Sequence, residues 1–170
     1  MDPAEGVRSF YLSHSGVVLA AQVIGLAAAG VFALFARATE DTTGDSRPGS
    51  GLVRQCGYGV AVAAAGTAVP VVWLCFAASH ASSRLVHGLA VTSDWTDVVL
   101  FAFISGFAVS VASSTTPRWL RAVAVVVFLV TGARAVLLAT GASALEVAAP
   151  LAFLALVASL VFVDLRRGIR

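Results

Sequence analysis

The chain has 170 residues, of which 59% are hydrophobic and only 12% are charged, whereas an average soluble domain carries about 25% charged residues. This composition excludes an ordinary soluble domain, and the length leaves room for about five membrane spans with short connections. The net charge of +2 is too small to indicate nucleic-acid binding, and the absence of lysine excludes a Schiff base or a lysine nucleophile.

The fold class that we predict is all-α, an integral membrane bundle of five transmembrane helices in a single domain over residues 1–170. Long apolar runs separated by polar breaks define the spans. The predicted spans are residues 16–35, 57–78, 96–113, 120–140 and 146–164. Residues 37–54 are rich in Gly, Ser, Thr, Pro and mixed charge and have no hydrophobic period, so we expect a flexible cytoplasmic loop there.

The placement of arginine predicts the orientation, because the cytoplasmic flanks of membrane spans are enriched in basic residues. With the amino terminus outside, eight arginines fall on the inner side, and two, Arg8 and Arg84, fall on the outer side. We therefore predict an N-out, C-in, multi-pass protein of the cell membrane that lies in the lipid bilayer.

Residues 73–97 form a polar stretch between two long apolar runs, and we expect the functional site there. The third apolar run, Val98–Ala112, is short. Covering a hydrocarbon core of about 30 Å therefore draws Trp95 and Asp97 toward the membrane.

Arg134 lies inside the fourth span, where an arginine costs about 2.5–3.5 kcal/mol on insertion scales. It should face the bundle interior and meet a carboxylate, and the carboxylates near its depth are Asp94, Asp97 and Glu146. We predict that Asp97, Glu146 and Arg134 are the catalytic group, with Arg134 setting which carboxylate is ionised. In the alternatives, Arg134 snorkels to the interface or only locks helix order, and Asp94 and Glu146 cap helices.

Aromatic and polar side chains should line a pocket beside these charges. The predicted substrate-binding residues are Trp73, Trp95, Phe101, Gln22 and His80, with Phe103 and Phe107 in the same wall. Aromatic ring faces stabilise positive charge, which suits a reaction that forms a cation.

His80, Arg84 and His87 follow an i, i+4, i+7 pattern, which places them on one face of a helix that continues through them. This face is either solvated at the interface or contacts a headgroup or anion. His14 and His80 are also weighed as a bis-histidine haem pair, but they lie at the rim of the bundle, and no other residue indicates a cofactor.

The two cysteines, Cys56 and Cys75, lie at opposite ends of one predicted helix, too far apart for a disulfide. Neither belongs to a CxxC motif. The sequence therefore predicts no metal site and no cofactor.

The run DWTDVVLFAFISGFAVSVASSTTPRWLRAVAVVVFLV, which begins at Asp94, joins a carboxylate-led helix to small residues, a PRWL turn and a further apolar run. It resembles the middle of small multi-span membrane proteins of the actinobacterial type, most of which have no assigned function. The chain is also similar to the small membrane-bound terpenoid cyclases. This second resemblance implies acidic side chains that protonate an alkene or epoxide beside aromatic walls, and Asp97, Glu146 and the tryptophans are the residues for these roles.

We therefore expect a membrane enzyme of the cyclase or isomerase type that acts on a lipophilic small molecule by acid–base chemistry, with proton-initiated terpenoid cyclisation as the specific reaction. One alternative is a non-catalytic subunit that docks onto copies of itself or into a membrane complex through small residues such as Gly59, Ala63 and Gly66. Another alternative is a transporter with Arg134 on an anion path, against which the lack of internal repeats argues.

Overall fold

The computed structural model describes residues 3–43, 50–113, 117–142 and 144–168, and all regular structure in these residues is helical. The helices are α1 (Pro3–Thr43), α2 (Ser50–Ala77), α3 (Ser83–Ser113), α4 (Arg118–Ala139) and α5 (Ala148–Gly168). Each of these 5 helices contains a stretch long and apolar enough to cross a membrane. The all-α class is therefore confirmed, and the helices indicate a multi-pass membrane protein.

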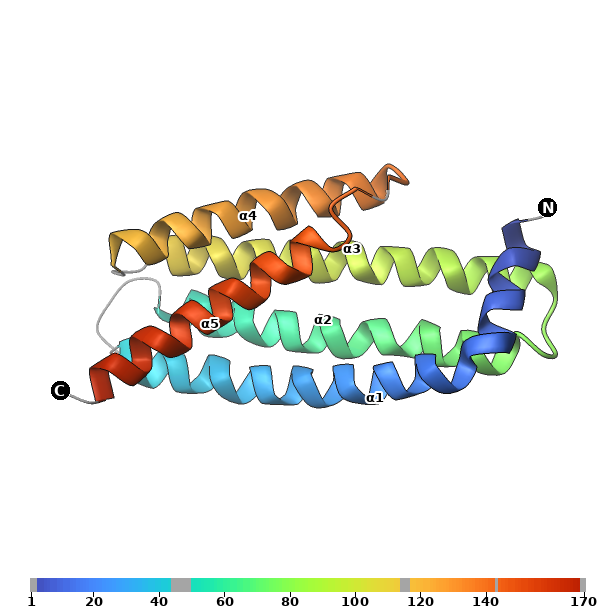
Figure 1. The fold of residues 1–170 in the computed structure, drawn as a ribbon, viewed down its shortest axis with the longest axis horizontal. Coiled ribbons are helices and arrows are strands. Elements are labelled where there is room, and N and C mark those ends of the chain that lie inside the picture. Colours follow the sequence, from blue (N-terminus) through green and yellow to red (C-terminus); the bar gives the residue numbers. More distant parts are fainter. Residues whose placement is uncertain (1–2, 44–49, 114–116, 143, 169–170) are drawn as a thin grey trace.

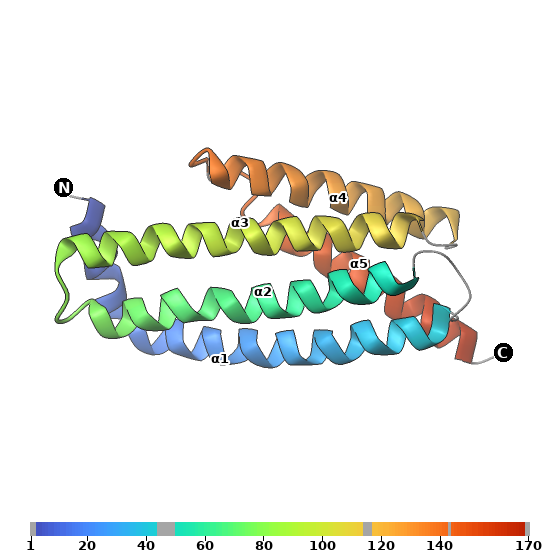
Figure 2. The ribbon, with the colours of Figure 1, turned by 180° about the vertical axis from the view of Figure 1, so that it is seen from behind.

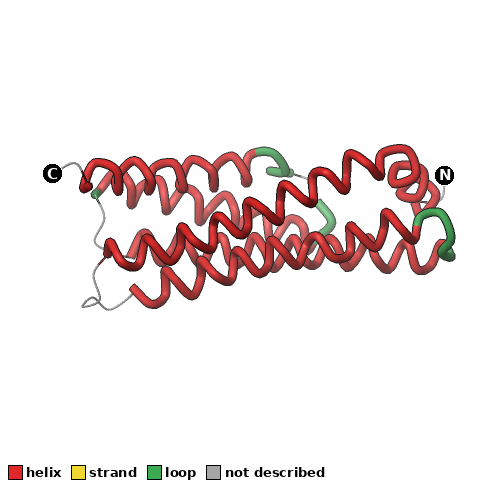
Figure 3. The backbone as a smooth tube through the Cα atoms, turned by 90° about the horizontal axis from the view of Figure 1, so that it is seen from below, coloured by secondary structure: helices red, strands yellow, loops and turns green. Residues whose placement is uncertain are grey.

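Helices α1 to α4 pack mainly on their neighbours in the sequence, α1 on α2, α2 on α3 and α3 on α4. Figures 1 and 2 show them side by side as an up-and-down array, with the α2–α3 turn near the amino terminus at one end. The carboxyl terminus lies at the opposite end (Figure 3). Helix α5 packs on α4 and runs diagonally across one face of the array (Figure 1), so it covers that face only in part.

Helix α1 is 41 residues long and extends beyond the predicted first span at both ends. The predicted loop over residues 37–54 is wrong for 37–43, which belong to α1, and for 50–54, which belong to α2. Residues 44–49 lie outside the described residues. Helix α1 therefore continues after the apolar run has ended, through Arg37, Ala38 and Glu40, which are good helix formers, and through threonines and an aspartate, which are weaker ones.

Helix α3 begins at Ser83, well before the predicted start of the third span, and has 31 residues. At 1.5 Å per residue it is about 46 Å long, more than a hydrocarbon core of about 30 Å requires. Asp94 and Asp97 therefore lie inside the helix, and the alternative that Asp94 caps its start is wrong. Helix α5 begins at Ala148, so Glu146 precedes it in the turn.

The buried core is small, because most large apolar side chains face outward. In the most apolar window of α1 only 6% of the residues are buried inside the protein. Three phenylalanines tie the helices together at the centre, since the ring centroid of Phe32 on α1 lies 5.5 Å from that of Phe107 on α3 and 5.3 Å from that of Phe153 on α5. A lipid bilayer solvates apolar side chains, so the outward-facing apolar surface is consistent with helices that lie in a membrane.

Glycines bring α2 close to its two neighbours. A Cβ atom on Gly57 would lie 2.6 Å from the Cβ of Ala36 on α1, and one on Gly59 would overlap the Phe103 ring on α3. Gly59 therefore packs against α3 within the chain. The docking role considered for it requires a glycine that is open to a partner protein, which Gly59 is not. Gly66 has no atom within 4 Å of its Cβ position.

Replacing Gly57 with alanine is expected to lower the free energy of unfolding by about 1–3 kcal/mol, the usual cost of overpacking. The opposing atom is the Cβ of Ala36, which cannot rotate away, so α1 and α2 must separate. The matched control is Gly66→Ala on the same helix, where the better helix propensity of alanine should leave stability unchanged or higher. Reversible unfolding in mixed micelles measures both variants, and equal stabilities would contradict the close α1–α2 packing.

Candidate functional site

A groove of about 620 Å³ is formed by α5 together with α1, α2 and α3. Its position follows from the diagonal course of α5 over these helices (Figure 1). We call it the lipophilic groove, and its lining residues are Gly25, Ala28, Ala29, Val31, Phe32, Phe35, Val60, Ala61, Ala64, Leu100, Phe101, Ile104, Pro150, Phe153, Leu154, Val157 and Val161.

The lining of the lipophilic groove contains no charged or hydrogen-bonding side chain. Its volume falls within the range of about 300–1,000 Å³ that small-molecule sites occupy. Four phenylalanines, Phe32, Phe35, Phe101 and Phe153, supply its aromatic surface. Such a groove favours a long apolar ligand and offers no partner to a polar one.

Asp97 lies on the face of α3 that leads into the lipophilic groove. Asp97, Leu100, Phe101 and Ile104 follow at i, i+3, i+4 and i+7 on this helix, and the last three line the groove. The Asp97 side chain is partly buried. Asp94 and Arg134 are close enough to interact electrostatically with its carboxyl group, and no hydrogen bond or ion pair joins that group to another described residue.

Arg134 is 7% exposed and lies near the end of α4. Its Nη1 donates hydrogen bonds to the carbonyl oxygens of Ala142 at 3.2 Å and Ala144 at 2.9 Å, and its Nε has no hydrogen-bond partner. The prediction that Arg134 faces the interior is confirmed. Among the described residues no ion pair joins Arg134 to a carboxylate: its guanidinium donates to backbone carbonyls of the α4–α5 turn, and Asp97 is near enough to interact with it electrostatically.

The other polar residues of the predicted site lie at different places. Gln22 is partly buried on α1 and shares a helix face with Gly25 and Ala29, which line the lipophilic groove. Glu146 is exposed in the turn before α5. The structure therefore brings Asp97, and also Gln22, to helix faces that continue into the groove, whereas Glu146 is left outside it.

The two tryptophans do not form the predicted wall. Trp73 is 62% exposed and Trp95 is 57% exposed, and neither lines the lipophilic groove. Of the predicted wall phenylalanines, Phe101 lines the groove, Phe107 is fully buried behind it, and Phe103 packs toward Gly59. Large aromatic rings are stable in contact with lipid, so their presence in a polar stretch does not show that they face inward.

His80 and His14 make local contacts. The chain turns after Ala77, so the predicted continuous helix through His80, Arg84 and His87 is wrong, and His80 lies in the turn before α3. The His80 Nδ1 shares a hydrogen bond with the Ser79 hydroxyl. His14 stacks on Phe10 with centroids 4.9 Å apart. No group of His, Cys, Asp and Glu that could hold a metal occurs in the described part of the chain.

Arg8 makes an important contact with the turn after α2, and the sequence did not predict this contact. Its Nε donates a hydrogen bond to the carbonyl oxygen of Ala78 at 2.7 Å, and its Nη2 donates to the carbonyl oxygen of Ala81. Arg8 and Arg134 thus perform the same task, since each donates to carbonyl oxygens of the turn that follows a helix, Arg8 after α2 and Arg134 after α4. The signal that could have identified them is an arginine placed at the depth of a predicted turn.

The cysteines agree with the prediction from their spacing. Cys56 and Cys75 both lie on α2 and are free.

Comparison of the chain with family models, with curated proteins and with solved structures gave no match. The groove and the residues around it are therefore the basis on which a function is assigned.

Proposed function

We propose that the protein is a multi-pass enzyme of the cell membrane that binds a lipophilic small molecule in the lipophilic groove and acts on it by acid–base chemistry. The observation that supports this proposal is the continuity of the site along one face of α3. Apolar residues of a groove of about 620 Å³ lead along that face to the partly buried carboxyl group of Asp97. An apolar cavity with few polar groups at its edge is the usual form of a small-molecule site.

The orientation that we propose is N-out and C-in. Eight arginines then lie on the cytoplasmic side and only two on the outer side, which is the usual bias of membrane proteins. Asp97 lies near the middle of α3. A substrate dissolved in the bilayer would reach the groove sideways, between α1 and α5, without crossing water.

The specific reaction that we propose is the cyclisation of a terpenoid. Asp97 donates its proton to an alkene or epoxide of the bound substrate, and an internal double bond attacks the resulting carbocation to form the ring. The cyclised cation then loses a proton to the Asp97 carboxylate, so the product is an isomer of the substrate and the acid is regenerated. The faces of Phe101 and its neighbouring phenylalanines stabilise the cation, and the apolar lining keeps water from capturing it.

Filling the groove tests the location of the ligand. Ala28 is exposed and lines the lipophilic groove, so Ala28→Trp occupies it at little cost to folding. We expect the affinity for a linear polyisoprenoid with a terminal epoxide to fall at least about tenfold, since about 1.4 kcal/mol of lost contact gives that factor. Equilibrium binding to the protein in nanodiscs measures it.

The matched control for this experiment is Ala27→Trp, because Ala27 is also exposed but does not line the groove. It should bind the polyisoprenoid as the unchanged protein does. Equal binding by both tryptophan variants would place the ligand elsewhere and refute the groove as the site.

A further inference from the structure

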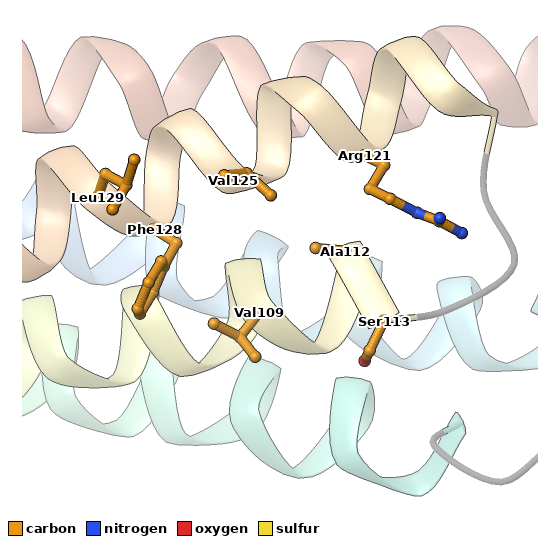
Figure 4. A pocket seen from close by; sticks show the side chains of 7 residues that line it. All are labelled: Val109, Ala112, Ser113, Arg121, Val125, Phe128 and Leu129. Carbon is orange, nitrogen blue, oxygen red and sulfur yellow. The ribbon is translucent and has the colours of Figure 1, made fainter.

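A second groove, between α3 and α4, has a polar end and an apolar body. It has a volume of about 400 Å³ and is lined by Val109, Ala112, Ser113, Arg121, Val125, Phe128 and Leu129. Figure 4 shows Arg121 and Ser113 toward one end and Phe128 and Leu129 toward the other. We call it the α3/α4 groove.

The polar and apolar parts of the α3/α4 groove lie in line along α4. Arg121, Val125, Phe128 and Leu129 follow at i, i+4, i+7 and i+8, which is one face of the helix. From Arg121 to Leu129 this face extends about 12 Å at 1.5 Å per residue. A ligand that lies along it therefore meets a cation at one end and a continuous apolar surface beyond it.

Arg121 lies where a phospholipid headgroup would be. It belongs to the beginning of α4, the end of a candidate membrane span, and Trp119 beside it is 46% exposed, as expected of an interfacial tryptophan. The Arg121 guanidinium makes no hydrogen bond or ion pair with another described residue. A planar guanidinium can bind a phosphate through two parallel hydrogen bonds.

We propose that the α3/α4 groove binds one anionic phospholipid, with its phosphate on Arg121 and an acyl chain along Val125 and Phe128. The charge of the arginine complements an anionic headgroup, and the apolar body complements the chain. This groove shares no lining residue with the lipophilic groove, so the proposal is independent of the proposed function.

Native mass spectrometry with phosphatidylglycerol and phosphatidylcholine of identical chains tests this proposal. The protein should retain phosphatidylglycerol about tenfold over phosphatidylcholine, and Arg121→Gln should bring the ratio close to one, because a lost charged hydrogen bond is worth about this factor. The control Arg166→Gln removes an arginine at the same end of the bundle, from α5 (Figure 1). It should keep the preference of the unchanged protein.

A second variant tests the acyl-chain part. Val125→Trp should lower the retention of both lipids, and Val126→Trp, at an exposed neighbour that does not line the groove, should not. The proposal is overturned if Arg121→Gln keeps the preference, if Arg166→Gln loses it equally, or if Val125→Trp retains both lipids in full. It is also overturned if inorganic phosphate displaces phosphatidylglycerol completely, since the site would then hold an ion and not a lipid.

Discussion

Replacing Asp97 with asparagine is expected to abolish turnover of the lipophilic substrate and to leave its binding nearly unchanged. Asparagine keeps the size and polarity of the side chain but has no acidic proton. A general acid in the transition state contributes about 10²–10⁴ in rate, so the reaction should become about a hundredfold slower or more. Conversion of the terminal polyisoprenoid epoxide in nanodiscs, followed by mass spectrometry, measures turnover, and equilibrium binding is measured alongside.

Two carboxylates serve as controls for this prediction. Asp94 is exposed and lies three positions before Asp97 on α3, and Glu146 is exposed in the turn before α5. Asp94→Asn and Glu146→Gln should each retain most of the activity, because the exposed Asp94 lies about one helical turn farther from the lipophilic groove than Asp97, and Glu146 lies in the turn before α5, outside the helices that line the groove. Full activity of Asp97→Asn would refute the proposed acid. Loss of activity in Glu146→Gln alone would move the role to that residue.

The largest loss of stability is expected when Arg134 is replaced by methionine. The carbonyl oxygens of Ala142 and Ala144 would then lose the donor that they have in the folded protein. Both hydrogen bonds are partly buried, and a hydrogen bond from a charged donor contributes about 1.5–3 kcal/mol. Removing the buried charge offsets part of this cost, so we expect a net loss of about 2–4 kcal/mol in the free energy of unfolding.

Reversible unfolding in mixed micelles measures this loss. Arg134→Lys should lose less than Arg134→Met, because an ammonium group can still donate to one of the two carbonyls. Arg166 lies on the exposed end of α5, over the Phe162 ring at 4.3 Å, so Arg166→Met should change stability little. An unchanged stability of Arg134→Met would show that the α4–α5 turn does not depend on the arginine.

The helical class and the approximate positions of all five helices followed from the sequence, because a bilayer requires long apolar runs whose backbone groups are satisfied within the helix. The exact ends of the helices could not be predicted in this way. Hydropathy reports where a helix meets lipid and not where its hydrogen bonds stop. The polar residues from Ser83 onward therefore extend α3, and residues 37–43 extend α1, without any apolar signal.

The candidate site was predictable only in part. The interior position of Arg134 followed from the cost of a charge in lipid, but its partners are backbone carbonyls, which no side-chain pattern displays. Phe101 was expected in the same pocket as Asp97, and it lines the groove four residues after Asp97 on α3. The lipophilic groove could not be predicted from the sequence. It depends on the diagonal course of α5 and on the contact between Phe153 and Phe32, which are far apart in the chain.

The most direct test of the central claim, that the lipophilic groove holds the ligand, is photo-crosslinking with a polyisoprenoid that carries a diazirine group. Peptide mapping by mass spectrometry should place the cross-links on groove residues such as Ala28, Ala64 and Phe153, and Ala28→Trp should suppress them. Cross-links confined to outward-facing side chains such as Val17 and Val62, which are 72% and 73% exposed, would contradict the claim.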